Sequence, residues 1–208
     1  MVRHTQTDWN REGRYQSRSD RLLTDFGRAR AEAVAARLRR GAYTTVVSTG
    51  LSRTDELAAL VIGGRRPVRD ERWRELDHGL WEGLTHDEIS TRYPEQARQR
   101  FGDFWNSRAH GGESGTELWA RVGAAWKDLL HDNSGGRVLV VAHGTPIRLL
   151  LCFLLGVPFE RHWQFRTDLG GITALDVYPS GTIARTLNEV PPIKGGLQYR
   201  VQGETCAG

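Results

Sequence analysis

Short apolar segments alternate along the chain with longer segments that have the spacing of helices. Residues 44–48 and 137–142 are rich in valine, and the second run is almost entirely apolar, which is typical of a strand buried on both faces. Residues 25–40, 51–62 and 145–155 instead carry the periodicity or the start and stop signals of helices. This alternation predicts crossover connections around a mostly parallel sheet.

A helical insertion interrupts the alternation. Between about residues 84 and 113, short helical patterns replace the repeat of strand and helix, and a Thr85 to Glu88 capping box opens the first of them. A second capping box, from Ser114 to Glu117, starts a longer helix that leads back into the sheet. We expect residues 84–113 to form a small helical cap.

The length of 208 residues fits one globular domain with a real core. Residues 67–69 predict one more short strand, and residues 172–178 and 182–187 predict a hairpin. The predicted fold class is α/β, a three-layer sandwich in which helices flank a mostly parallel central sheet. A single domain is expected over residues 1–190, followed by an irregular C-terminal tail over residues 191–208.

Composition excludes several functional classes. No apolar run approaches the roughly 20 residues that would span a bilayer, and residues 3–21 are too polar for a signal peptide. Cys152 and Cys206 have neither zinc spacing nor the pattern of a disulfide framework. We therefore expect a soluble, cytoplasmic protein that binds no membrane, no metal and no cofactor.

The formal net charge is +4, and the arginines are spread along the chain rather than clustered. This distribution does not indicate a nucleic-acid-binding surface. A small anionic partner suits it better, because a positively charged cleft concentrates anions. The oligomeric state stays open, with a homodimer as one option.

Two histidines directly follow predicted strands. His4 comes after Val2 and Arg3, and His143 directly follows the apolar run at residues 137–142. Ligands of open α/β sheets bind where strands end, so both imidazoles are expected to face one crevice. Arg3 and Arg53 add guanidinium groups at the same edge, and arginine is suited to grip phosphate. Each residue alone has an ordinary structural explanation, and only the joint pattern indicates catalysis.

Five segments resemble, in order, the motifs of the histidine phosphatase superfamily, the phosphoglycerate-mutase-like fold. Five matches in order make coincidence improbable. The segments are residues 3–10 (RHTQTDWN), 48–53 (STGLSR), 75–85 (ELDHGLWEGLT), 112–114 (GES) and 141–144 (VAHG).

The resemblance implies a role for each matched residue. His4 would be the nucleophile and form a phosphohistidine, while Arg3, Arg53 and His143 would bind the phosphoryl oxygens. Glu75 would serve as acid and base. Four further residues are expected to contact phosphate or substrate, namely Thr7, Asn10, Gln16 and Gly144.

Two positions depart from the family pattern. Thr5 stands where the family has glycine, so the nucleophile loop is expected to sit differently. The first strand is unusually short, which suggests that the true start lies upstream of Met1.

The expected activity is a phosphomonoesterase that hydrolyses a small phosphorylated metabolite, such as a sugar phosphate or a biosynthetic intermediate. The chain is too short for the larger cap insertions of the family's glycolytic mutases, which favours water as the acceptor. A phosphoglycerate-type mutase is the nearest alternative. A catalytically silent relative that binds phosphorylated ligands is the second.

Overall fold

The computed structural model describes residues 1–193, which contain one six-stranded sheet in the order β3-β2-β4-β1-β5-β6. The first four strands in this order are mutually parallel, and β5 and β6 form an antiparallel extension. The strands are β1 (Val2–Arg3), β2 (Thr45–Ser48), β3 (Val68–Arg69), β4 (Val138–Ala142), β5 (Ile172–Tyr178) and β6 (Gly181–Glu189).

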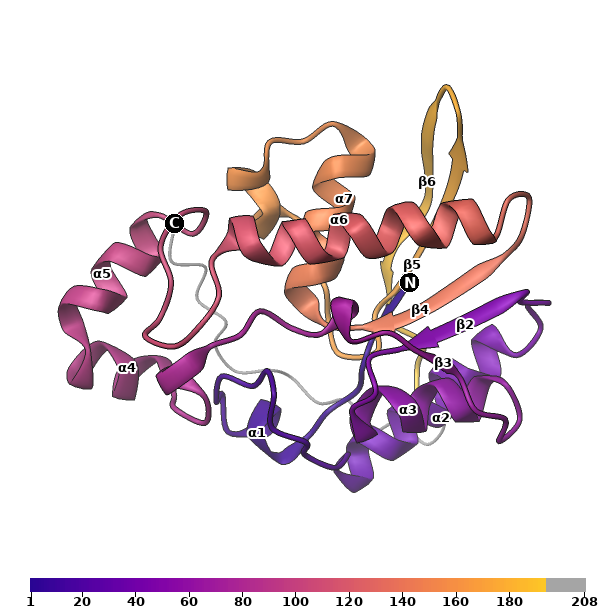
Figure 1. The fold of residues 1–208 in the computed structure, drawn as a ribbon. Helices are drawn as coiled ribbons and strands as arrows, with labels where there is room; N and C mark the ends of the chain where they lie inside the picture. Colours follow the sequence, from indigo (N-terminus) through magenta and orange to yellow (C-terminus); the bar gives the residue numbers. More distant parts are fainter. Residues whose placement is uncertain (194–208) are drawn as a thin grey trace.

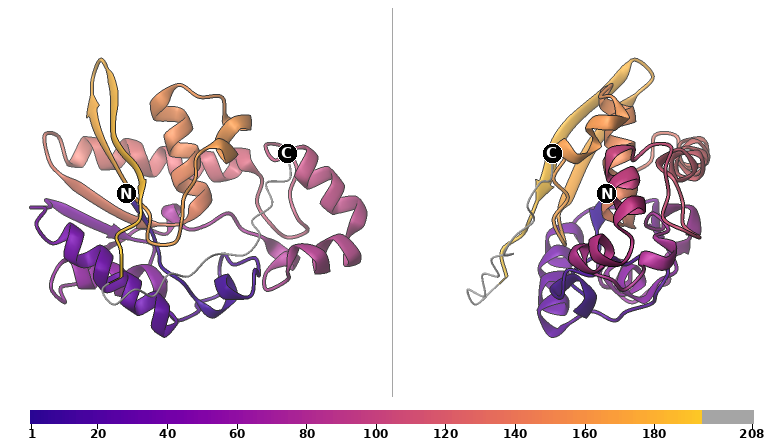
Figure 2. Two further views of the ribbon diagram at one scale, coloured as in Figure 1. Left: turned by 180° about the vertical axis from the view of Figure 1, so that it is seen from behind. Right: turned by 90° about the vertical axis from the view of Figure 1, so that its left-hand side faces the viewer.

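Helices cover both faces of the sheet (Figure 1). On one face lie α2 (Asp25–Leu38) and α3 (Ser52–Val61), and on the other lie α6 (Gly115–Asp132) and α7 (Gly144–Leu155). Figure 2 shows the same layering from behind and from the side.

The pleat of β4 explains the three layers. Leu139 and Val141 belong to the apolar cluster beneath α2 and α3, while Val140 and Ala142 belong to the cluster beneath α6 and α7. Successive side chains of a strand point to opposite faces, so an unbroken apolar run supplies both clusters. The predicted fold class is confirmed.

The cap forms a separate lobe beyond the ends of the parallel strands (Figure 1). It contains α4 (His86–Arg92) and α5 (Pro94–Gly102), with its own small apolar cluster. The predicted capping boxes at Thr85 and Ser114 are both present. These helix starts confirm the predictions.

Some short elements were not predicted. They are α1 (Asp8–Arg11) and the 3-10 helices η1 (Glu71–Trp73), η2 (Gly79–Trp81) and η3 (Phe159–Gln164). Residues 191–193 have no regular structure, and the remainder of the predicted tail, including Cys206, lies outside the described residues. Within residues 1–193, no helix is both long enough and apolar enough to cross a bilayer.

Candidate active site

Neighbouring parallel strands bring the two histidines together. His4 directly follows β1 and His143 directly follows β4, and Arg3 is in register with Ala142. The backbone N–H of His4 donates to the carbonyl of Ala142 at 3.0 Å. The two imidazole rings have centroids 5.0 Å apart and planes at 64° to each other. The two rings therefore lie side by side where these neighbouring strands end.

A backbone carbonyl sets the tautomer of His4. Nδ1 lies 2.7 Å from the carbonyl oxygen of Thr5, and because a carbonyl can only accept, Nδ1 must carry the proton. Nε2 of the neutral ring then keeps its lone pair. Within residues 1–193, Asn188 is the one non-glycine residue with positive φ, so Thr5 does not need the conformational freedom of glycine.

Both imidazoles are buried and held uncharged. Burial keeps the pKa of His4 well below its ordinary 6.5, and the positive charges of Arg53 and Arg3 lower this pKa further. Burial likewise lowers the pKa of His143, with Arg53 adding to the effect. His4 is therefore neutral at neutral pH.

Acid should destabilise the fold through these two rings. Their folded pKa values lie below the unfolded value, so stability is lost as pH falls from about 6.5 toward the folded pKa values. At pH 5.5 the expected loss is up to about 1.4 kcal/mol for each ring. Urea unfolding at pH 7.5 and 5.5 measures it, and His143→Gln should reduce the difference by about that amount. His131→Gln, which changes an exposed ring, should not reduce it, and equal pH dependence in wild type and His143→Gln would contradict the prediction.

Arg53 is a buried guanidinium held by backbone carbonyls. Nη1 donates to the carbonyl of Ser19 and Nη2 to that of Ser17, each at 2.8 Å. Nε is buried and has no hydrogen-bond partner among residues 1–193. Burial lowers the pKa of Arg53 to about 10, so the side chain stays charged at neutral pH. A fixed, charged fork with an unused N–H suits an incoming phosphate oxygen.

A backbone carbonyl also holds the guanidinium of Arg3. Its Nη1 donates to the carbonyl of Thr167 at 2.7 Å. Gly144 lies against the same guanidinium, because a Cβ added at Gly144 would be 3.6 Å from both Cζ and Nε of Arg3. The predicted residues Arg3 and Gly144 are thus neighbours at the start of α7.

The Glu75 carboxylate lies at the amino end of α7. Oε1 accepts from the backbone N–H of Leu76 at 2.8 Å, and Oε2 accepts from that of Thr145 at 3.3 Å. Glu75 is buried, and these two backbone N–H groups hold its carboxylate at the start of α7.

Arg121 on α6 forms hydrogen bonds with the backbone of the segment that carries Glu75. Its Nη2 donates to the carbonyl of Glu75 at 2.9 Å, and its Nη1 donates to the carbonyls of Arg72 and Arg74. Nε and Nη2 also donate to the two carboxylate oxygens of Glu113, each at 2.7 Å. The motif residue Glu113 therefore orients the arginine that fixes the backbone of Glu75.

Three of the predicted substrate contacts form a network. The hydroxyl of Thr7 lies 3.0 Å from Oδ1 of Asn10 and 2.8 Å from Oε1 of Gln16. Thr7 is fully buried, and its hydroxyl also caps α1. Nε2 of Gln16 is buried and has no hydrogen-bond partner in the described part of the chain.

Sequence reasoning missed two supporting threonines. Oγ1 of Thr49 lies 3.1 Å from Nε2 of His143, and the carbonyl of Thr167 holds Arg3. Thr49 lies inside a matched motif, so its position between Ser48 and Arg53 could have drawn attention to it. Thr167 lies outside every matched motif and acts through its backbone, so the sequence carries no signal for it.

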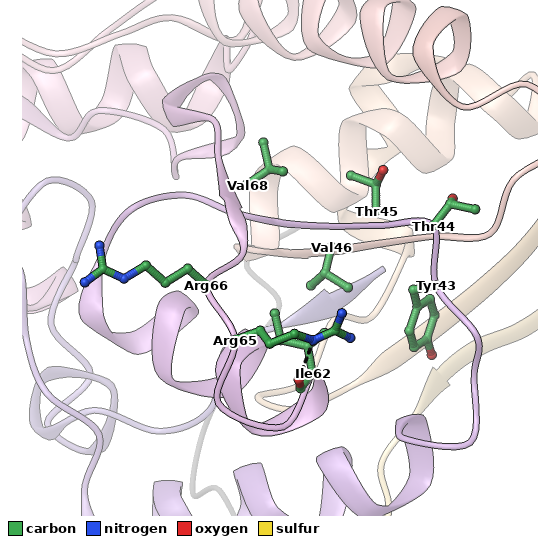
Figure 3. A pocket seen from close by; sticks show the side chains of 8 residues that line it. All are labelled: Tyr43, Thr44, Thr45, Val46, Ile62, Arg65, Arg66 and Val68. Carbon is green, nitrogen blue, oxygen red and sulfur yellow. Dashed lines mark hydrogen bonds between the residues drawn. The ribbon is translucent and has the colours of Figure 1, made fainter.

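The cavity drawn in Figure 3 has no part in this site. It has a volume of about 180 Å³ and lies where β2 begins, at Thr45, whereas the histidines lie where the parallel strands end. Figure 3 shows Arg66 pointing away from the other lining side chains. Within residues 1–193, no three His, Cys, Asp or Glu side chains are grouped as metal ligands.

Comparison with known proteins identifies the family. The model of the histidine phosphatase superfamily (branch 1) matches residues 1–190. The chain belongs to this superfamily. The resemblance drawn from the five motifs is therefore confirmed.

Relatives within the family carry different names. The chain is 30% identical over 191 residues to phosphoserine phosphatase 1 of Hydrogenobacter thermophilus, covering 90% of each chain. It is 33% identical over 186 residues to the probable phosphoglycerate mutase GpmB of Yersinia pestis, covering 88% of this chain and 86% of that one. The structure of the α-ribazole phosphatase from Shigella flexneri superposes with a TM-score of 0.84 at 26% identity, covering 91% of this chain and 95% of that one.

Proposed function

We propose that this protein is a phosphomonoesterase that hydrolyses a small organic phosphate through a phosphohistidine on His4. The observation that carries the proposal is the neutral, buried His4, whose Nδ1 proton is fixed by a carbonyl while Arg53 and Arg3 supply positive charge beside it. Phosphatases among the relatives support the choice of reaction.

In the first half-reaction, Nε2 of His4 attacks phosphorus and the bond from phosphorus to the ester oxygen breaks. The two arginines would neutralise charge on the equatorial oxygens, which is the main requirement of phosphoryl transfer, and the neutral His143 would donate a hydrogen bond to one of them. Nδ1 of His143 is buried without a hydrogen-bond partner among residues 1–193, so in the tautomer with the proton on Nδ1 this N–H would donate to one of those oxygens. Glu75, when protonated, gives its proton to the leaving oxygen.

In the second half-reaction, the Glu75 carboxylate takes a proton from water, and the water oxygen attacks the phosphohistidine. The bond from phosphorus to Nε2 breaks, and inorganic phosphate leaves. Gln16 offers its unpartnered amide to substrate, and Thr7 would act by orienting Gln16 and Asn10 rather than by touching the ester.

A panel of phosphorylated metabolites tests this function. We expect phosphate release from at least one small ester, and we expect chelator not to reduce the rate. Phosphoserine, α-ribazole phosphate and phosphoglycerates belong in the panel because the relatives are named for such compounds.

The mutase alternative rests on the similarity to a protein named as a phosphoglycerate mutase. Incubation with 3-phosphoglycerate separates the two activities. Isomer exchange faster than phosphate release would favour the mutase, while tight phosphate binding without turnover of any ester would favour a silent relative.

A further inference from the structure

The loop at residues 17–20, here called the strap, joins the base of the cap to the phosphate side of the site. Its carbonyls at Ser17 and Ser19 hold the guanidinium of Arg53, each at 2.8 Å. Its last residue, Asp20, accepts from the backbone N–H and the hydroxyl of Ser52 at 2.8 and 2.7 Å. Ser52 is the first residue of α3 and immediately precedes Arg53. The strap therefore holds both the guanidinium of Arg53 and the residue that precedes it.

One carboxylate fixes the strap. Oε1 of Glu82 accepts from the backbone N–H groups of Ser17 and Ser19, both at 2.9 Å. Oε2 accepts from the N–H of Ser17 at 3.0 Å and also from its hydroxyl. Within residues 1–193, no basic side chain forms an ion pair with Glu82, so the strap supplies all of its hydrogen-bond donors.

The carboxylate is ionised where it lies. Burial opposes its ionisation, but hydrogen bonds from Ser17 and Ser19 outweigh burial and hold the pKa of Glu82 below its ordinary value. Hydrogen bonds to a charged acceptor are about twice as strong as neutral ones. The negative charge of Glu82 also favours the charged form of Arg53.

We propose that Glu82 is a positioning residue that sets the geometry of Arg53 through the strap. The inference rests on the proposed function, since Arg53 matters only if it binds phosphate. Glu82 precedes Gly83, whose N–H donates to the carbonyl of Tyr15 at 2.8 Å, and the cap helix α4 starts three residues later. The cap and the phosphate-binding guanidinium are thereby tied to one carboxylate.

Glu82→Gln tests the proposal because the amide keeps the shape but, in either orientation, brings an NH2 group against at least one backbone donor. Binding of inorganic phosphate, measured by calorimetry, needs no turnover and so stands apart from the proposed function. We expect Glu82→Gln to weaken phosphate binding about 10-fold or more. Ser17→Ala, which removes one donor and keeps the backbone, should weaken it severalfold.

A mutant cycle separates positioning from general damage. If Glu82 acts through Arg53, adding Glu82→Gln to Arg53→Ala should weaken phosphate binding by less than about threefold beyond Arg53→Ala alone. Glu117→Gln is the matched control, since it weakens a capping box on α6 that has no link to the strap, and it should leave phosphate binding unchanged. Unchanged binding in Glu82→Gln, or losses that multiply in the double variant, would overturn the proposal. Failure of the wild type to hydrolyse any ester would instead overturn the proposed function.

Discussion

Replacing His4 with alanine should abolish phosphate release, lowering kcat/KM by at least about 10⁴-fold. In the proposed mechanism, the substitution removes Nε2, the atom that forms the bond to phosphorus. His143, 5.0 Å away between ring centroids, follows the neighbouring strand and is bound through Nε2 to Thr49. Phosphate release from the best ester of the panel measures the loss.

Rapid quenching into base gives a second measurement. Phosphohistidine survives in base, so the wild type should yield a phosphorylated peptide that contains His4, and His4→Ala should yield none. His131→Ala is the control, because the ring of His131 is exposed on the surface. This variant should retain full activity. Phosphate found on another residue, or activity that survives in His4→Ala, would rule out the mechanism.

Replacing Arg53 with alanine should lower kcat/KM by about 10³-fold. The guanidinium is buried and charged, and it would neutralise phosphoryl oxygens more strongly in the transition state than in the bound ester. The loss should therefore appear largely in kcat. Affinity for vanadate, which mimics the five-coordinate phosphorus, should fall in parallel.

Arg53→Lys is a second variant that controls for a folding defect, because lysine keeps the positive charge. Lysine lacks the planar guanidinium that holds both strap carbonyls and can still bind phosphate. We expect it to recover only part of the lost rate. Arg98→Ala, at an exposed ion pair on the cap, should behave like the wild type. A kcat within threefold of wild type in Arg53→Ala, with intact folding, would exclude this role for Arg53.

The layers of the fold were predictable because local signals agreed with the global arrangement. The run at residues 137–142 supplies apolar side chains to both faces of the sheet, and the capping boxes at Thr85 and Ser114 fix two helix starts. By contrast, α1 has only four residues and η3 only six, too few to show a periodicity. Such short elements depend on contacts made elsewhere in the chain.

The side chains of the candidate site were easier to predict than what holds them. His4 and His143 follow recognisable strands, so topology alone brings their backbones together. The partners of Arg53 and Arg3, in contrast, are carbonyls of Ser17, Ser19 and Thr167. Every residue has a carbonyl, so residue identity gives no indication of which ones will face a guanidinium.

The separate apolar cluster of the cap has a consequence for how such proteins diversify. Trp81, Ile89, Ala97 and Ala109 pack with one another, apart from the two clusters that hold the sheet. Substitutions there can reshape the cap without loosening the strands, whose apolar contacts lie in the other two clusters. The cap can thus vary while the candidate site is retained, provided that the hydrogen bonds between Glu82 and the strap are kept.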